Sequence, residues 1–131
     1  MAHEDDAAEL APVAPELFVP DVPEAARFYE TALGFRIIRC EPDFAIVSLG
    51  ECVIMLAAEA MYGSMGGENS GQRGQLIDIR LVVPDVDAMY RRAKENRVAI
   101  VHDIGDRPYG LRDFILRDPH GFRLRFASPL R

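Results

Sequence analysis

The sequence predicts an α+β domain in which two βαβββ modules pair to form a concave sheet cleft. The main observation is a repeat: Phe-Val-Pro-Asp-Val at 18–22 returns 64 residues later as Val-Val-Pro-Asp-Val at 82–86. Each copy ends an apolar stretch, opens a run with helical spacing, and is followed by three short runs that alternate as strands do. Two such units fill the 131 residues, so each is half of a small domain.

The length suits one domain with a sizeable core and is too short for two independent ones. We expect a flexible acidic tail at 1–13, which holds four carboxylates and no Lys or Arg. A single domain at 14–131 follows. Its first module covers about 14–57, a linker covers 58–74, and the second module covers about 75–131.

The first module is predicted to begin with a strand at 16–19. Asp21 then caps a helix, with Glu24 three residues later in a relative of the capping box. The buried face of this helix has the spacing i, i+3, i+4, i+7, i+8 and consists of Ala25, Phe28, Tyr29, Ala32 and Leu33. Gly34 ends the helix, and strands follow at about 35–40, 44–49 and 52–57.

The linker at 58–74 contains five glycines and shows no periodicity. A loop of this length is usually either functional or disordered. Met61, Tyr62 and Met65 can lie over an apolar ligand or pack onto the body of the domain, and the sequence leaves both interpretations open.

The second module repeats the plan, with a strand at about 75–83 and Asp85 as the helix cap. The apolar stripe of the helix is Val86, Met89, Tyr90 and Ala93, and Asn96 is a plausible stop. Strands are expected at about 98–104, 111–117 and 122–127. The last two are joined by a tight turn at Asp-Pro-His-Gly, residues 118–121.

Alternation along the strands separates a face under each helix from a face that lines the cleft. On the cleft face the second module carries the charged residues Asp78, Arg80, Asp113, Arg123 and Arg125, whereas the first module offers an apolar wall that includes Val53 and Met55. We therefore predict a ligand-binding set consisting of Met55, Asp78, Tyr109, Asp113, Ile115 and Arg125. The same charges also fit a cleft closed by its own ion pairs.

Composition excludes several classes of function. No apolar run approaches the roughly 20 residues of a membrane span, and the acidic N-terminus is unlike a secretory signal. Arginines alternate with acidic residues, so no nucleic-acid surface is predicted. Cys40 and Cys52 lie in apolar strand patterns and are expected as buried thiols in a reducing cytoplasm. Residues 1–70 are acidic and 71–131 basic, a contrast that favours attraction within a chain or across a dimer.

Two runs carry a family resemblance. V-P-D-V-x-x-A-x-x-F-Y-x-x-x-L-G-F at 19–35 and R-P-Y-G-L-R-D-F-I-L-R-D-P-H-G-F-R-L-R-F at 107–126 resemble the vicinal oxygen chelate superfamily, which contains glyoxalases, dioxygenases and bleomycin-resistance proteins. The ending is most similar to the bleomycin-resistance branch. The resemblance implies paired βαβββ modules and a homodimer.

The resemblance also implies where a metal would bind in the enzymes of the superfamily. Carried over by motif, the four ligand positions are Ala14 or a near neighbour, Met55, Asp78 and Arg125. Only Asp78 among these suits a hard divalent ion, so we expect no metal and no other cofactor. No other catalytic motif is present, but Asp78 or Asp113 also fits a general base beside Arg125. The same residues also read as an ion pair.

The sequence thus favours a metal-free protein that sequesters a small molecule in the cleft, in the manner of antibiotic-resistance proteins of this type. We expect a cytoplasmic homodimer that binds neither nucleic acid nor membrane and has no enzymatic activity. The first alternative is a metal-dependent enzyme of the glyoxalase or dioxygenase type. The second is an enzyme without metal that uses Asp78 and Arg125.

Overall fold

The structure is a computed structural model and describes residues 4–130. The chain divides after Gly71 into two compact units, each of which is considered by itself. Among the helices that residues 4–130 form, none is both long and apolar enough to span a membrane.

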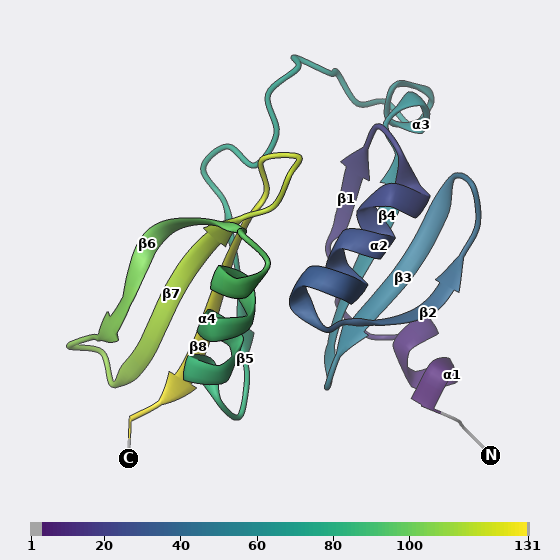
Figure 1. The fold of residues 1–131 in the computed structure, drawn as a ribbon. Coiled ribbons are helices and arrows are strands. Elements are labelled where there is room, and N and C mark those ends of the chain that lie inside the picture. The colour runs from purple at the N-terminus through teal and green to yellow at the C-terminus, as the bar shows by residue number, and fades with distance from the viewer. Residues whose placement is uncertain (1–3, 131) are drawn as a thin grey trace. The chain divides into compact units, whose positions relative to one another are not determined.

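The first unit contains the predicted module (Figure 1). Its elements in chain order are β1 (Glu16–Val19), α2 (Val22–Leu33), β2 (Arg36–Cys40), β3 (Phe44–Leu49) and β4 (Cys52–Ala58). The strands form one sheet in the order β1-β4-β3-β2. β1 runs parallel to β4, and the other neighbouring strands are antiparallel. The first strand of the module therefore pairs with its last.

Helix α2 begins and ends at the residues that the sequence predicts. The Asp21 carboxylate accepts a hydrogen bond from the backbone N–H of Glu24 at 3.0 Å. Gly34 ends the helix in the left-handed conformation with φ 81°, and its N–H donates to the carbonyl of Glu30. The buried stripe packs Tyr29 edge-on against Phe35, with 5.2 Å between the ring centroids, so the helix covers one face of the sheet.

The second unit repeats this plan. Its elements are β5 (Asp78–Val82), α4 (Val86–Glu95), β6 (Ala99–Asp106), β7 (Leu111–Arg117) and β8 (Arg123–Pro129), in the sheet order β5-β8-β7-β6. The Asp85 carboxylate accepts from the N–H of Ala88 at 3.0 Å, as Asp21 does in the first unit. Fully buried apolar side chains alternate along β7 and β8 beneath α4: Phe114, Leu116, Leu124 and Phe126. The predicted α+β class and the repeated βαβββ plan are confirmed.

Three elements differ from the prediction. A helix, α1 (Glu4–Glu9), lies within the segment expected to be a flexible tail, and a short helix, α3 (Ala60–Ser64), lies within the expected linker. β5 begins only at Asp78, because Leu76 has φ 57° and is fully exposed. Contacts with distant residues place α1, and a tail's composition does not reveal such contacts.

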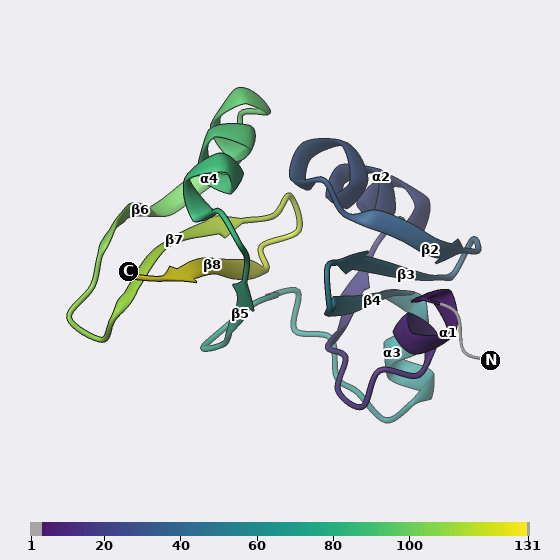
Figure 2. The same cartoon turned by 90° about the horizontal axis from the view of Figure 1, so that it is seen from below.

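Helices α1 and α3 lie on the opposite side of the first sheet from α2 (Figure 2). The Arg39 side chain of β2 donates to the Glu9 carboxylate of α1, with 2.6 Å between Nε and Oε1. The ring of Tyr62 in α3 meets that of Phe18 in β1 at a centroid distance of 4.8 Å. Of the two interpretations of Tyr62, the structure therefore supports packing onto the first unit.

The expectation of two buried thiols is wrong. Cys40 is exposed and Cys52 is partly exposed. Cys40 is the last residue of β2, which is an edge strand of its sheet, so its side chain has no neighbouring strand on one side. An apolar strand pattern alone does not distinguish an edge strand from a central one.

Candidate functional site

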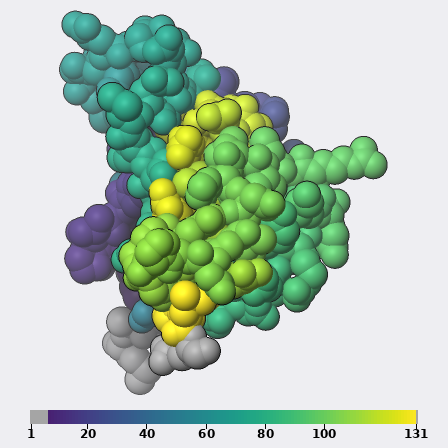
Figure 3. Space-filling model, turned by 90° about the vertical axis from the view of Figure 1, so that its left-hand side faces the viewer, coloured from purple at the N-terminus to yellow at the C-terminus, as the bar shows by residue number. Residues whose placement is uncertain are grey.

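The face of the second sheet opposite α4 carries the predicted charged residues. Strand register places Asp78 beside Arg123 and Ile115 beside Arg125. In the space-filling view the light-green atoms of the β6–β7 region lie beside the yellow atoms of β8 on the visible side of this unit (Figure 3). Hydrogen bonds connect polar side chains of β5, β7 and β8, and of the turn between β6 and β7, on this face of the sheet.

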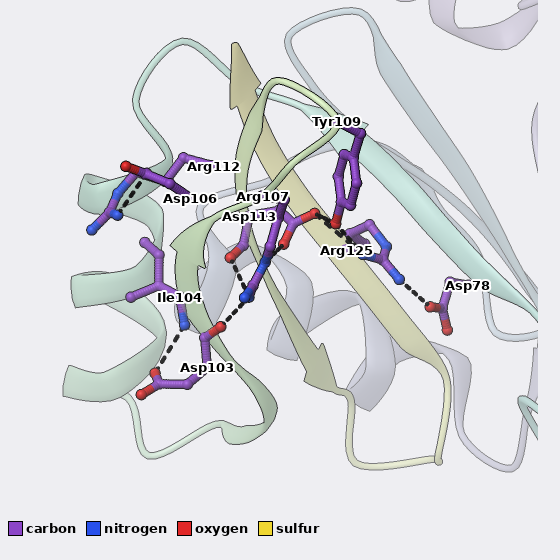
Figure 4. Close-up of polar contacts among 9 residues, drawn as sticks. All are labelled: Asp78, Asp103, Ile104, Asp106, Arg107, Tyr109, Arg112, Asp113 and Arg125. Atoms are coloured by element: carbon purple, nitrogen blue, oxygen red, sulfur yellow. Dashed lines mark hydrogen bonds and ion pairs between the residues drawn. The ribbon is translucent and has the colours of Figure 1, made fainter. Parts of the chain in front are cut away.

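Asp113 of β7 is the centre of this face and has no solvent exposure. Its Oδ1 accepts from Nε of Arg107 at 2.8 Å. Its Oδ2 accepts from the hydroxyl of Tyr109 at 2.6 Å and from Nη1 of Arg125 at 3.2 Å (Figure 4). A buried carboxylate is tolerated only when it is paired and hydrogen-bonded in this way.

Arg125 connects Asp113 to a second carboxylate. Its Nη2 donates to Oδ2 of Asp78 at 3.1 Å (Figure 4), and Nε of Arg123 donates to Oδ1 of Asp78 at 2.6 Å. We call the connected set the polar network; its members are Asp78, Arg107, Tyr109, Asp113, Arg123 and Arg125. With three guanidiniums and two carboxylates, the network has one excess positive charge.

A tight turn holds Arg107 and Tyr109 over β7. The N–H of Gly110 donates to the carbonyl of Arg107 at 3.1 Å, and Gly110 has φ 87°, a conformation that glycine adopts without a steric cost. The N–H of Arg107 in turn donates to the carbonyl of Leu111 at 2.8 Å. The Arg107 guanidinium also donates to the backbone carbonyls of Asp103 and Asp113. This turn therefore positions two members of the polar network.

The network keeps both carboxylates ionised. Burial by itself raises the pKa of Asp113, but hydrogen bonds from Arg107, Tyr109 and Arg125 outweigh it, so the pKa lies below the usual value. The hydrogen bond from Arg123 is the main reason that the pKa of Asp78 is also lowered. Carboxylates with lowered pKa values are weak bases near neutral pH. The general-base interpretation is therefore disfavoured.

The pKa of Tyr109 shifts upward, whereas the pKa values of the two carboxyl groups shift downward. Its hydrogen bond to Asp113 raises the pKa of the phenol, because ionisation would place a phenolate against a carboxylate. Tyr109 thus remains a donor at neutral pH, and more than half of the residue's surface is exposed. Its ring is available to a molecule on this face.

The structure joins four of the six predicted site residues by direct contacts: Asp78, Tyr109, Asp113 and Arg125. Ile115 lies next to Arg125 in register but is only 2% exposed, so it offers little apolar surface. Met55 belongs to the first unit, where it pairs with Glu16 and Ile46.

The predicted set omits two members of the polar network. Arg123 follows from the alternation of β8, which places it on the same face as Arg125. Arg107 is harder to find, because it lies outside a strand and only the turn at residues 107–110 directs it back onto Asp113.

The residues at the expected metal-ligand positions do not fit a divalent ion. Ala14 and Met55 supply no hard oxygen ligand, and Arg125 carries a positive charge. Both oxygens of Asp78 accept from guanidiniums. Glu16, near Ala14, is an exposed carboxylate in register with Met55. Within residues 7–130, no group of three or more His, Cys, Asp or Glu side chains is placed to hold a metal.

Comparison with known proteins extends over nearly the whole chain. Residues 10–126 match a family profile described as "Glyoxalase/Bleomycin resistance protein/Dioxygenase superfamily". A comparison with curated proteins gave no match.

Solved structures with the same fold are numerous at low identity. TioX from Micromonospora sp. ML1 is 23% identical, with a TM-score of 0.71, over 91% of this chain and 96% of that one. A glyoxalase/bleomycin resistance protein/dioxygenase family enzyme from Burkholderia phytofirmans PsJN is 22% identical, with a TM-score of 0.74, over 88% and 95%. A glyoxalase-related enzyme from Fulvimarina pelagi is 18% identical, with a TM-score of 0.74, over 88% and 86%. At these identities the likeness shows the fold alone.

Proposed function

Because this chain belongs to the glyoxalase/bleomycin resistance protein/dioxygenase superfamily, we propose that it binds a small molecule without a metal and without transforming it. The binding surface is the sheet face of the second unit that carries the polar network. In this respect the protein acts in the manner of the bleomycin-resistance branch. Two expectations stay predictions: that the modules form a cleft, and that the protein is a homodimer.

The observation that supports this proposal is the accessibility of the donors around a buried carboxylate. Asp113 is fully buried, whereas the side chains of Arg107 and Arg125, which donate to it, are 20% and 27% exposed. Ligand sites combine a few fixed polar groups with apolar or aromatic surface, and here Tyr109 supplies the ring. The excess positive charge of the network favours an acidic group on the part of the ligand that contacts this face.

The Arg125→Ala variant separates ligand binding from a purely structural role. Probes for a thermal-shift screen are bleomycin and a panel of small organic acids and amines. If Arg125 contacts the ligand, the variant loses the stabilisation that a binding probe gives to the wild type, because a charge-assisted hydrogen bond disappears. Tyr109→Phe is the matched control for the network, since it removes one hydroxyl and leaves the ring.

The contrary result for Arg125→Ala is a lower melting temperature with probe binding unchanged. The charged side chains of the polar network would then stabilise the folded state without contacting a ligand. Absence of any probe-induced shift in the wild type also counts against the proposed function.

The rival function is a metal-dependent enzyme of the same superfamily, and exposed Glu16 beside Met55 is the observation in its favour. We expect protein purified without chelator to contain far less than one equivalent of Zn, Ni, Mn or Fe by elemental analysis. The physical reason is the cationic Arg125 and the guanidinium-bound Asp78 at two of the four expected ligand positions. About one equivalent of any of these metals that survives dialysis would establish the rival.

A further inference from the structure

A groove of about 710 Å³ lies at the end of the first unit where β3 turns into β4. The N-terminal segment forms one side of it with Ala8, Ala11 and Pro12, and strand residues form the other side with Arg36, Ser48 and Val53. Ligand pockets in proteins have volumes of about 300–1,000 Å³. The groove is therefore large enough for a drug-sized molecule.

The floor of the groove is a row of neighbouring side chains on one sheet face. Arg36 pairs in register with Ser48, and Ser48 pairs with Val53. Directly paired residues point to the same side of a sheet. Helix α2 covers the other side, so this row lies on the face that α1 approaches (Figure 2).

Small residues in the roof leave the volume open. Ala8 is buried, yet its methyl group, like those of Ala7 and Ala11, fills little space. The hydrogen-bonded ion pair between Glu9 and Arg39 holds α1 against the sheet at one side of the groove. This anchor holds α1 over the sheet without filling the groove.

Among the described residues the groove lining carries one basic and one acidic side chain, Arg36 and Glu51. Arg36 already has an interaction partner. Glu51 lines the groove and is exposed, and its carboxylate has no hydrogen bond or ion pair with the residues that the structure describes. Residues 1–70 hold thirteen acidic and three basic side chains, so the surrounding potential also attracts cations.

We propose that this groove is a second binding site, specific for a small cation with an apolar body, such as a primary or quaternary amine. The apolar body contacts the alanines, Pro12 and Val53, and the cationic group faces the Glu51 carboxylate. The site lies entirely in the first unit. It shares no residue with the polar network, so a test of this site is independent of a test of the proposed function.

Three probes with one apolar body test the proposal: 4-phenylbutylammonium, 4-phenylbutanol and 4-phenylbutyrate. Each is titrated into the full chain while backbone amide signals are followed by NMR. We expect shifts confined to residues 7–12, 34–36 and 48–53. The ammonium should bind about threefold more tightly than the alcohol, the range of an exposed ion pair, and the carboxylate most weakly.

Glu51→Gln should abolish the preference for the ammonium while leaving the alcohol's affinity unchanged. Glu30→Gln is the matched control, because Glu30 is an exposed carboxylate on α2, which covers the opposite face. Ala11→Leu partly fills the groove and should weaken all three probes. Its melting temperature shows whether the variant has folded.

Two results would overturn the proposal. One is a set of amide shifts outside the groove residues. The other is an ammonium preference that survives Glu51→Gln, or that falls equally in Glu30→Gln.

Discussion

Replacing Asp113 by Asn lowers the free energy of unfolding by about 3 kcal/mol. Breaking a buried ion pair by removing one partner costs about 3–5 kcal/mol, and the lower end applies because Arg107 and Arg125 remain partly exposed. The amide can donate but it cannot accept three charge-assisted bonds, so Arg107 and Arg125 lose the charge of Asp113, and Arg125 keeps its ion pair with Asp78. Urea denaturation monitored by circular dichroism measures the change.

The same variant has a flatter dependence of stability on pH. Folding lowers the pKa values of Asp78 and Asp113 below the value of about 3.9 in an unfolded chain. These groups therefore stabilise the fold above pH about 4, and this stabilisation disappears as the pH falls through the folded-state pKa values. Wild type should lose stability below pH about 4 more steeply than Asp113→Asn.

Asp106→Asn is the control for both measurements. Asp106 also pairs with an arginine, Arg112, but its side chain is 63% exposed, so its replacement should change stability little. An Asp113→Asn protein as stable as wild type, with the same acid profile, would show that the polar network does not stabilise the folded state.

Phe126→Ala is expected to destabilise the protein by about 3–5 kcal/mol. Phe126 is fully buried and stacks on Phe114 with 5.7 Å between the ring centroids. Truncation removes the transfer free energy of the ring and leaves a cavity beneath α4. The same urea denaturation applies, and Phe126→Leu should lose only part of this stability because it retains much of the volume.

Phe126 is also a test of strand alternation, since it follows Arg125 on β8 and points to the opposite face. Its replacement should act on stability, whereas that of Arg125 should act on ligand binding. If Phe126→Ala were tolerated without loss of stability, the packing between α4 and β8 described above would be wrong.

The elements of the two modules were predictable because their signals are local. Asp21 and Asp85 each stand before an apolar stripe, and the structure shows both as helix caps. Alternation along residues 111–117 and 122–127 places Phe114 and Phe126 on one face and Asp113 and Arg125 on the other. The stacking of the two rings and the ion pair between Asp113 and Arg125 confirm this separation. Sequence periodicity thus identifies which side chains share a face of a helix or sheet, even where it does not identify the residues that they contact.

The remaining features depend on contacts between residues distant in the sequence. Helix α1 is anchored by Glu9 to Arg39, a partner thirty positions away. The place of Arg107 depends on the geometry of a turn, and the exposure of Cys40 on strand order. Neither composition nor periodicity encodes these relations, so the groove beneath α1 could not be predicted from the sequence.

The parallel pairing of first and last strands in each module has a consequence for the order of folding. The antiparallel strands β2, β3 and β4, like β6, β7 and β8, are joined by short loops and can associate early at a small entropic cost. β1 and β5 pair later, because their partners, β4 and β8, lie almost a full module further along the chain. Closing this pair sets the contact order of the module, so its nucleus is expected among the later strands and the edge strand docks last.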